Sequence, residues 1–331
     1  MRRRVLSILI ILLMIVVVGC SSGQQDAENQ GAKKEKIRVG VIQIVEHPSL
    51  NAARNGFKDM LAEEGYEEGK DVVYDYQNAQ GDMSTAQTIA KTFSQKDFDL
   101  ILSIATPTSQ AVANTIKDTP ILITAVTDPK TAGLVDSMDQ PGGNLTGTSD
   151  LTPVKKQLNL FNRIEREIEK VGILYNSGET NSVFLKDLAK QEAENIGIEM
   201  IEAPVTQSSE VYQTAQSLVG RVDGIYVPTD NTIVSAIESV IKVTNKNNIP
   251  LIVADNNSVN AGALATLGID YYKLGQQTGK MAVQVLNGAD PGQLPIQRIQ
   301  EADLIINKKA ADKMNVDISQ ELLDEAKKVI K

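Results

Sequence analysis

Residues 98–126, FDLILSIATPTSQAVANTIKDTPILITAV, contain one complete unit of the predicted fold. Two apolar runs rich in β-branched residues, 98–105 and 120–126, flank a stretch at 109–116 that has the spacing of a helix. A strand, a helix and a second strand so close together predict a right-handed crossover between parallel strands. A parallel sheet of this kind is covered by helices on both faces.

The same alternation continues on both sides of this unit. Before it, strand-like runs at 37–44 and 72–76 alternate with helical stretches at 50–64 and 83–93. The pattern restarts after GGNLTG, residues 142–147, with strands at 171–175, 199–203, 224–227 and 250–254, and helices at 183–195, 211–219 and 232–244. The sequence therefore predicts an α/β protein with two doubly wound parallel-sheet lobes.

Four elements remain after the two lobes are complete. They are a strand of small residues at 262–268, a helix at 271–286, a strand at 302–306 and a terminal amphipathic helix at 320–330. This surplus predicts that the chain crosses between the lobes more than once, which makes a multi-crossover hinge. A cleft between hinged lobes is a favoured place for a small ligand.

The N-terminus has the pattern of a bacterial leader. Three arginines at 2–4 precede an apolar run of 14 residues, 5–18, which is shorter than the ~20 residues that span a bilayer as a helix. Gly19 and Cys20 follow the run, and the ending VVGC, residues 17–20, resembles a bacterial lipobox. We expect a signal peptide at 1–19, a lipid on Cys20 and a flexible tether at 20–36, which is rich in polar residues. The alternative is an ordinary secreted leader with an incidental cysteine.

Composition excludes several classes of protein. A net charge of −9 makes nucleic acid a poor partner, because phosphate binding draws on clustered Lys and Arg. One Cys excludes an internal disulfide, and with a single His it excludes a Cys/His zinc cage. No phosphate-binding glycine loop or nucleophile motif is present. We therefore expect no catalytic residues, no cofactor and no metal. We also expect a monomer.

Polar residues follow the predicted strands of the first lobe, at the sheet edge where α/β proteins bind ligands. In ATPTSQ, 105–110, Thr106 is a candidate N-cap, and the N–H groups of Thr108 and Ser109 are candidates to hold an anion. Asp128, in VTDP, either accepts a hydrogen bond from a ligand or closes a turn before Pro129. His47, in EHPS, is a candidate pocket-wall residue and a poor candidate for a base.

The second lobe carries three polar strand ends, at 175–179, 228–231 and 254–257. Asp230 and Asp255 are candidates to pair with a ligand ammonium in a water-poor cleft. The alternative role for both is a helix N-cap. Tyr175, Tyr226 and Tyr271 are candidate ring partners for a ligand, although core packing is the more common role of such residues.

Several longer passages carry a resemblance to a known family. They are IQIVEHPSLNAARNGFKDML, ATPTSQA, VTDPKTAGLV, GGNLTGTSD, NSGETNS, PTDNTI and GALATLGIDYYKLGQQTGKMA, between residues 42 and 282. In these passages the chain resembles the solute-binding lipoproteins of bacterial ABC importers, which have the type I periplasmic-binding-protein fold. Within that group it resembles the branch that binds aromatic amino acids of the tryptophan/tyrosine type.

The resemblance implies three crossovers, near 147–151, 266–270 and 300–305. The lobes would be 37–148 plus 268–302 and 149–267 plus 303–331. It also implies that the following residues lie around the cleft: His47, Thr106, Thr108, Ser109, Asp128 and Ser149 on one side, and Asn176, Glu179, Asn181, Asp230 and Asp255 on the other.

We expect an extracytoplasmic binding protein that captures a small solute and delivers it to a membrane permease. An aromatic amino acid is the expected solute, since polar strand ends and helix N-termini can hold a carboxylate and an ammonium together. A sugar or a purine is the alternative solute, and a lipoprotein that signals ligand binding to a membrane receptor is the alternative role. An enzyme that uses the same cleft is less favoured, because it would need a nucleophile, metal or cofactor signature.

Overall fold

The computed structural model describes residues 36–299 and 301–331. The predicted signal peptide, Cys20 and all of the predicted tether except Lys36 lie outside these residues. Residues 36–331 form a compact unit of their own. In the described part of the chain, no helix combines the length and the apolar character needed to cross a bilayer.

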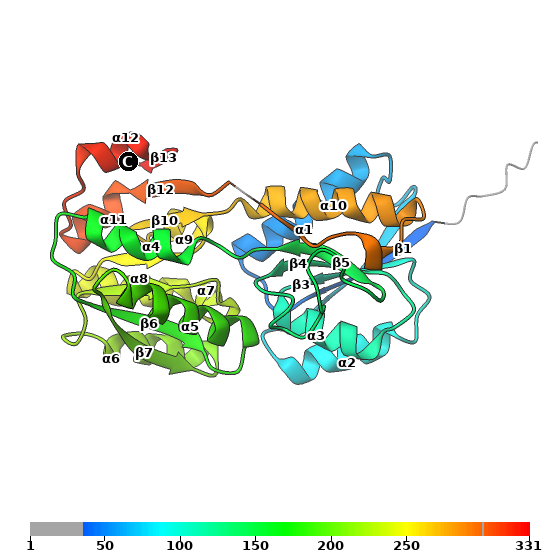
Figure 1. Cartoon of the computed structure of the whole chain (residues 1–331), viewed down its shortest axis with the longest axis horizontal. Helices are drawn as coiled ribbons and strands as arrows, with labels where there is room; N and C mark the ends of the chain where they lie inside the picture. Colours follow the sequence, from blue (N-terminus) through cyan, green and yellow to red (C-terminus); the bar gives the residue numbers. More distant parts are fainter. Residues whose placement is uncertain (1–35, 300) are drawn as a thin grey trace, which may run out of the picture. The chain divides into compact units, whose positions relative to one another are not determined.

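The first sheet has six parallel strands in the order β11-β5-β4-β3-β1-β2. Their bounds are β1 Ile37–Gln43, β2 Val72–Asn78, β3 Leu100–Ile104, β4 Ile121–Val126, β5 Leu145–Ser149 and β11 Gln297–Arg298. Its helices are α1 Pro48–Glu63, α2 Met83–Phe93, α3 Thr106–Thr115 and α10 Tyr271–Leu286. Figure 1 shows α1 and α10 on one face of this sheet and α2 and α3 on the other. We call this sheet with its helices the first lobe.

The second sheet has seven strands in the order β13-β12-β10-β9-β8-β6-β7. Their bounds are β6 Lys170–Asn176, β7 Glu199–Val205, β8 Gly224–Val227, β9 Leu251–Val253, β10 Ala265–Gly268, β12 Asp303–Asn307 and β13 Lys328–Ile330. Only the pair β10 and β12 is antiparallel. The helices are α4 Val154–Leu158, α5 Thr180–Glu194, α6 Val211–Ser217, α7 Asn231–Ser235, α8 Ile237–Asn247, α9 Asn256–Ala261, α11 Lys308–Met314 and α12 Gln320–Glu325. This is the second lobe.

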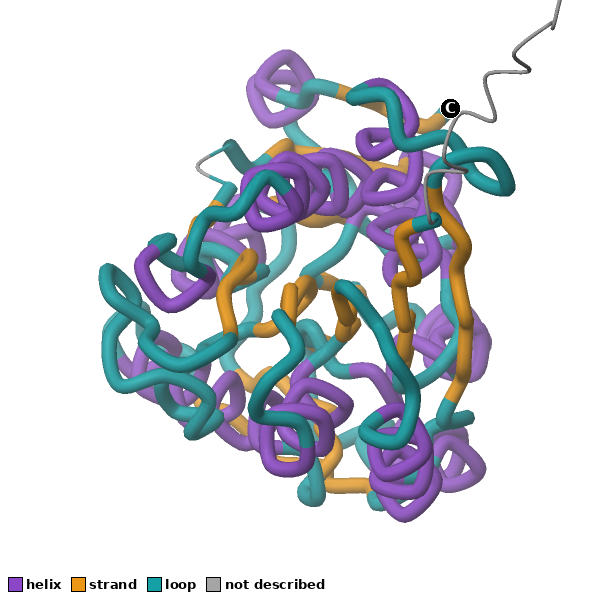
Figure 2. Tube along the Cα trace, turned by 90° about the vertical axis from the view of Figure 1, so that its right-hand side faces the viewer, coloured by secondary structure: helices purple, strands orange, loops and turns teal. Residues whose placement is uncertain are grey.

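The two lobes are wound in the same way, which confirms the predicted fold class. The orders β2-β1-β3-β4-β5 and β7-β6-β8-β9-β10 repeat one pattern, and each sheet has its own apolar core. Figure 2 shows helices on both sides of the strands. Because parallel strands end at the same edge of a sheet, the loops after the strands of each lobe gather at one edge.

The chain passes between the lobes at three places: after β5, after β10 and after β11. After the second passage, α10 packs along α1 at very short range. A Cβ atom on Gly275 would lie 1.9 Å from the carbonyl oxygen of Ala53, and one on Gly56 would lie 2.0 Å from that of Tyr272. Glycine at both positions therefore sets how closely these two helices approach.

Two predicted helices differ from the structure. The terminal helix ends at Glu325, and Lys328–Ile330 forms β13 instead. These residues pair with β12, whose edge would otherwise present unpaired backbone groups. The predicted helix at 232–244 is two helices, α7 and α8, which meet at Ala236, where φ is −117°. Sequence periodicity misses this break because the apolar spacing continues through it.

Candidate functional site

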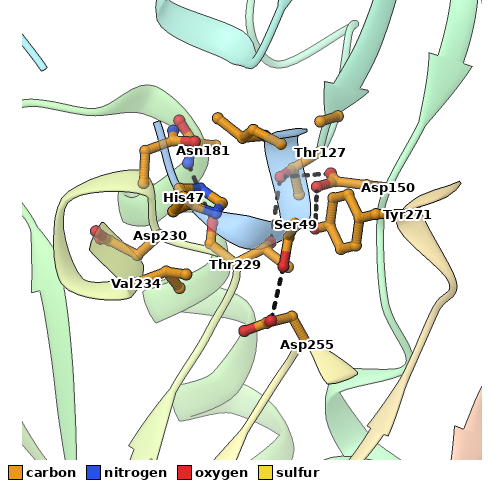
Figure 3. Close-up of a pocket in the computed structure, with 13 residues that line it drawn as sticks. His47, Ser49, Thr127, Asp150, Asn181, Thr229, Asp230, Val234, Asp255 and Tyr271 are labelled. Carbon is orange, nitrogen blue, oxygen red and sulfur yellow. Dashed lines mark hydrogen bonds between the residues drawn. The ribbon is translucent and has the colours of Figure 1, made fainter. Parts of the chain in front are cut away.

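A small cavity lies between the strand-end loops of the two lobes (Figure 3). Both lobes contribute polar and apolar side chains to its wall. The lining residues are His47, Ser49, Leu50, Ala125, Thr127, Asp150 and Tyr271 from the first lobe and the passages beside it, and Asn181, Thr229, Asp230, Asn231, Val234 and Asp255 from the second. Among the described residues, three carboxylates and neither Lys nor Arg line the cavity.

Asp230 is the most deeply buried of these carboxylates, at 1% exposure. It is the N-cap of α7 and accepts hydrogen bonds from the backbone N–H of Ile233 (2.8 Å) and of Asn176 (2.6 Å). Burial raises the pKa of Asp230 to about 7, and the charge of Glu179 acts in the same direction. The hydrogen bonds therefore offset only part of the cost of burying this negative charge. A ligand cation beside the carboxylate would stabilise the charge further.

Asn181 and His47 bring unpartnered polar atoms to the cavity. Asn181, at the start of α5, is 5% exposed, and its Oδ1 has no hydrogen-bond partner among the described residues. His47, the N-cap residue of α1, is 8% exposed, and its Nδ1 likewise has none in that part of the chain. Burial lowers the pKa of His47 to about 4 although Asp255 opposes the shift, so the ring is neutral. Because buried polar atoms usually have a hydrogen-bond partner, these two atoms are candidates to contact a ligand.

Asp255 connects the two lobes. It is the N-cap of α9 and accepts hydrogen bonds from the N–H groups of Asn257 and Ser258, each 3.0 Å long. Ser49 of α1, in the first lobe, donates a further hydrogen bond of 2.7 Å to the same carboxylate. Figure 3 shows this bond at the edge of the cavity.

A second chain of hydrogen bonds runs along the other side of the cavity. The hydroxyl of Tyr271 donates to Asp150 (2.6 Å), and so does that of Thr127 (3.1 Å). The hydroxyls of Thr127 and Thr229 are 3.5 Å apart across the lobes. Burial raises the pKa of Asp150, and the two hydroxyl donors oppose the shift.

The backbone at this edge of the first sheet is strained. Ala105, after β3, has φ 86°, and Ala125, near the end of β4, has φ 55°. These values lie in the left-handed region, which non-glycine residues adopt at an energetic cost. At Ala125 the pairing of β4 with β5 also shifts register. The strain occurs where the sheet edge meets the cavity, which is typical of functional sites.

Four of the eleven predicted site residues line the cavity: His47, Asn181, Asp230 and Asp255. Two others, Asn176 and Glu179, belong to the hydrogen-bond network around Asp230. The side chain of Asn176 donates to Thr232 (2.7 Å) and to Glu179 (3.3 Å), and Glu179 accepts from Asn231, a lining residue. Glu179 also lines a neighbouring pocket between the lobes, with Gln80, Asp82 and Thr206.

Thr106, Thr108 and Ser109, the predicted residues of α3, do not line the cavity. Thr106 was expected to cap the helix, but the cap residue is Ala105 and Thr106 begins the helix. The Ser109 N–H is not free for an anion, because it donates to Ala105 O. The Thr108 hydroxyl donates to Ile104 O, and that of Ser109 to Ala105 O. The Thr106 hydroxyl is buried and has no partner in the described residues.

Asp128 and Ser149 have local partners. Asp128 accepts from the N–H of Thr131 (2.7 Å), which is the turn role considered for it, and Ser149 donates to Thr127 O (2.7 Å). In each case a chain neighbour, Thr127 or Asp150, lines the cavity instead. Side chains on extended backbone alternate in direction, so neighbouring positions of one loop face different surroundings.

Other lining residues were missed. Ser49, Leu50, Ala125, Asn231 and Val234 carry no signal that separates them from helix and strand residues. Tyr271 was considered as a ring partner, and it lines the cavity. Tyr226 is a core residue whose hydroxyl donates to Gln157 (2.6 Å), and Tyr175 lies outside the cavity lining. Among the residues that the structure describes, no group of three or more His, Cys, Asp or Glu is placed to hold a metal ion.

Close relatives are solute-binding proteins. The chain is 43% identical over 312 residues to the tyrosine-binding protein of Clostridioides difficile strain R20291, covering 92% of this chain and 90% of the relative. It is 37% identical to a Streptococcus pneumoniae ABC domain crystallised with L-Trp, with a TM-score of 0.86, covering 89% of this chain and 100% of that structure. These relatives confirm the expectation of a binding protein rather than an enzyme.

Two further structures concern the conformation and the fold. The ligand-free, open form of a Clostridium difficile substrate-binding protein with adhesive properties is 41% identical, covering 89% of this chain and 99% of that structure, yet its TM-score is only 0.67. By TM-score, the structure of this chain is therefore more similar to the L-Trp complex than to the open form. A myo-inositol-bound solute-binding protein from Bacillus halodurans, 17% identical, shares the fold with a TM-score of 0.59, covering 86% of this chain and 99% of that structure.

The family model described as ABC transporter substrate binding protein matches residues 38–330, nearly all of the described chain. It covers both lobes and every residue that lines the cavity. The chain therefore belongs to the ABC transporter substrate-binding protein family.

Proposed function

We propose that this protein captures an aromatic amino acid, tryptophan or tyrosine, outside the cytoplasm and delivers it to an ABC permease. The cavity between the lobes carries the proposal, because buried carboxylates and unpartnered polar atoms from both lobes meet there. One relative is named a tyrosine-binding protein, and another was crystallised with L-Trp. The Tyr271 ring, Leu50 and Val234 offer apolar surface for an aromatic side chain.

We assign ligand contact to the four predicted residues that line the cavity. Asn176 and Glu179 are assigned to positioning Asp230, through the hydrogen bonds described above. Thr106, Thr108, Ser109, Asp128 and Ser149 are assigned to shaping the first-lobe edge of the cavity. The Thr106 hydroxyl and the N-terminus of α3 remain candidates for the ligand carboxylate.

The mechanism we propose is a population shift. Residues 37–148 with 268–302 and residues 149–267 with 303–331 act as two rigid lobes. A ligand that binds both lobes stabilises the closed arrangement only by its higher affinity for that arrangement. The permease then recognises the closed form. A lipid on Cys20 would hold the protein at the outer face of the cell membrane, and the leader pattern supports this.

The test is a thermal-shift screen of residues 36–331 with the twenty amino acids, sugars and purines, together with mass spectrometry of any co-purified ligand. A ligand at 100 times its Kd adds about 2.7 kcal/mol to stability, so binding is readily seen. We expect a shift with tryptophan or tyrosine that Asp230→Asn reduces. The matched control Asp223→Asn should keep the shift, since that carboxylate accepts from the N–H groups of Glu169 and Lys170 and lies outside the cavity lining. A shift with a sugar or purine alone would contradict the proposal.

A further inference from the structure

Three hydrogen-bond acceptors lie on one side of the cavity. They are the Asp230 carboxylate, Asn181 Oδ1 and His47 Nδ1, and Figure 3 shows the three side chains together, opposite Asp150 and Tyr271. Two of them come from the second lobe and His47 comes from the first. All three side chains are more than nine-tenths buried.

The orientation of Asn181 is fixed by its own contacts. Its Nδ2 donates to Thr229 O (3.2 Å) and to Ser182 Oγ (3.3 Å). A backbone carbonyl can only accept, so the atom that faces Thr229 must be the nitrogen. Oδ1 is therefore the atom left without a partner in the described residues, and it requires a donor.

His47 is available as an acceptor because its ring is neutral. Burial keeps the pKa of His47 near 4, so at neutral pH one ring nitrogen carries a lone pair. Nδ1 is buried and has no hydrogen-bond partner within residues 36–299 and 301–331. A ligand donor at Nδ1 would place the ring proton on Nε2.

We infer that Asp230, Asn181 Oδ1 and His47 Nδ1 form a site specific for a primary ammonium group, with one acceptor for each of its three N–H donors. The inference rests on the proposed function and names the ligand group that the site selects. A hydroxyl supplies one donor and a secondary ammonium two, so either leaves at least one buried acceptor unpaired.

The other two lining carboxylates are less suited to this role. Asp255 already accepts from Ser49, from the N–H groups of Asn257 and Ser258, and from the Ser258 hydroxyl. Asp150 accepts from Tyr271 and Thr127, and it lies on the other side of the cavity from Asn181 and His47 (Figure 3). Asp230 accepts from two backbone N–H groups and from Ser182, and it is the carboxylate on the same side as Asn181 and His47.

The experiment compares L-tryptophan with Nα-methyl-L-tryptophan by isothermal titration calorimetry on the purified protein. Methylation replaces one N–H donor and leaves the rest of the ligand unchanged. We expect the methylated ligand to bind at least about tenfold more weakly, since a buried acceptor loses its donor. In Asn181→Leu and in His47→Phe, which remove one acceptor each, this ratio should fall below about threefold.

Asn247→Leu is the matched control. Asn247 lies on α8 outside the cavity lining, and its amide donates to Val243 O (2.7 Å), so the variant should keep the wild-type ratio. Melting curves establish that each variant is folded, and either of the two acceptor variants decides the matter alone. A wild-type ratio below about threefold, or a ratio that stays at the wild-type value in a folded acceptor variant, overturns the inference.

The proposed function and this inference can fail separately. If tryptophan and tyrosine do not bind but another amino acid does, the proposed substrate is wrong, and the same ratio is measured with that amino acid and its N-methyl derivative. If none of the twenty amino acids binds, both are overturned.

Discussion

The hydroxyl of Tyr271 donates a 2.6 Å hydrogen bond to Asp150, and each residue stands on a different passage of the chain between the lobes. Asp150 follows β5, and Tyr271 is the first residue of α10. Both side chains are buried and both line the cavity. The bond therefore links two of the three passages between the lobes beside the cavity.

Tyr271→Phe removes this donor and keeps the ring. The buried Asp150 carboxylate then has Thr127 as its remaining side-chain donor, and we expect the free energy of unfolding to fall by about 1–3 kcal/mol. Ligand affinity should fall as well, because the hinge passages lose their link. Chemical denaturation and calorimetry measure the two effects. Tyr175→Phe is the control, since its hydroxyl contacts Glu202 outside the cavity lining, and an equal loss there would contradict the hinge role.

Asp230 should make ligand binding depend on pH. Its pKa is about 7 without ligand, and an ammonium beside it would lower that value, so binding below pH 7 must release a proton. Affinity is expected to fall by about tenfold per pH unit below 7 and to be constant above about pH 8. Calorimetry across pH 5–9 measures this profile, and Asp230→Asn should flatten it. A profile that is flat in the wild type would refute the assignment.

The same carboxyl affects stability in the absence of ligand. Its folded-state pKa lies above the ordinary value of 3.8, so the folded protein binds the proton more tightly and loses stability as pH rises from about 4 to 7. His47 acts in the opposite direction, because its pKa is lowered from 6.5 to about 4 and stability falls as pH drops through that range. Glu179 is the charged group that faces Asp230 in the same network.

The fold was predictable because its signals are local and repeated. Apolar runs such as those of β3 and β4 are buried on both faces, and their flanking helices keep a regular spacing, so their type and order can be read from the sequence. The C-terminal strand was missed because it depends on tertiary pairing. Lys328–Ile330 becomes a strand only because the edge of β12 is open to it.

The site was predictable to the level of the loop but not of the side chain. Asp230 and Asp255 were identified because an acidic N-cap after a strand is a recognisable pattern. Thr127 and Asp150 were missed by one position, because direction in an irregular loop follows from backbone torsions such as φ 55° at Ala125. Ser49 joins the site only through the contact between lobes, which sequence periodicity does not encode.

Gly275→Ala should destabilise the first lobe. The added methyl would lie 1.9 Å from Ala53 O, a backbone atom of α1 that cannot move without displacing the helix. Overpacking of this kind costs about 1–3 kcal/mol or more. Urea denaturation of the variant measures the loss, with Lys280→Ala on the exposed face of α10 as the control. Unchanged stability would show that α1 and α10 are not held at this distance in solution.

Ser49→Ala should shift the protein toward an open arrangement in the absence of ligand. The substitution removes the 2.7 Å hydrogen bond by which the first lobe reaches Asp255, while the backbone N–H groups of Asn257 and Ser258 still satisfy that carboxylate. The closed form should therefore lose about 0.5–1.5 kcal/mol relative to the open form, with little change in the fold of either lobe. Solution scattering with and without a saturating ligand measures this shift. Without ligand, the variant should have a larger radius of gyration than the wild type. With ligand bound, the two proteins should have the same radius of gyration. Ser235→Ala, whose hydroxyl donates to Thr232 O within the second lobe, is the matched control, and an equal expansion in that variant would show that Ser49 has no specific role in closure.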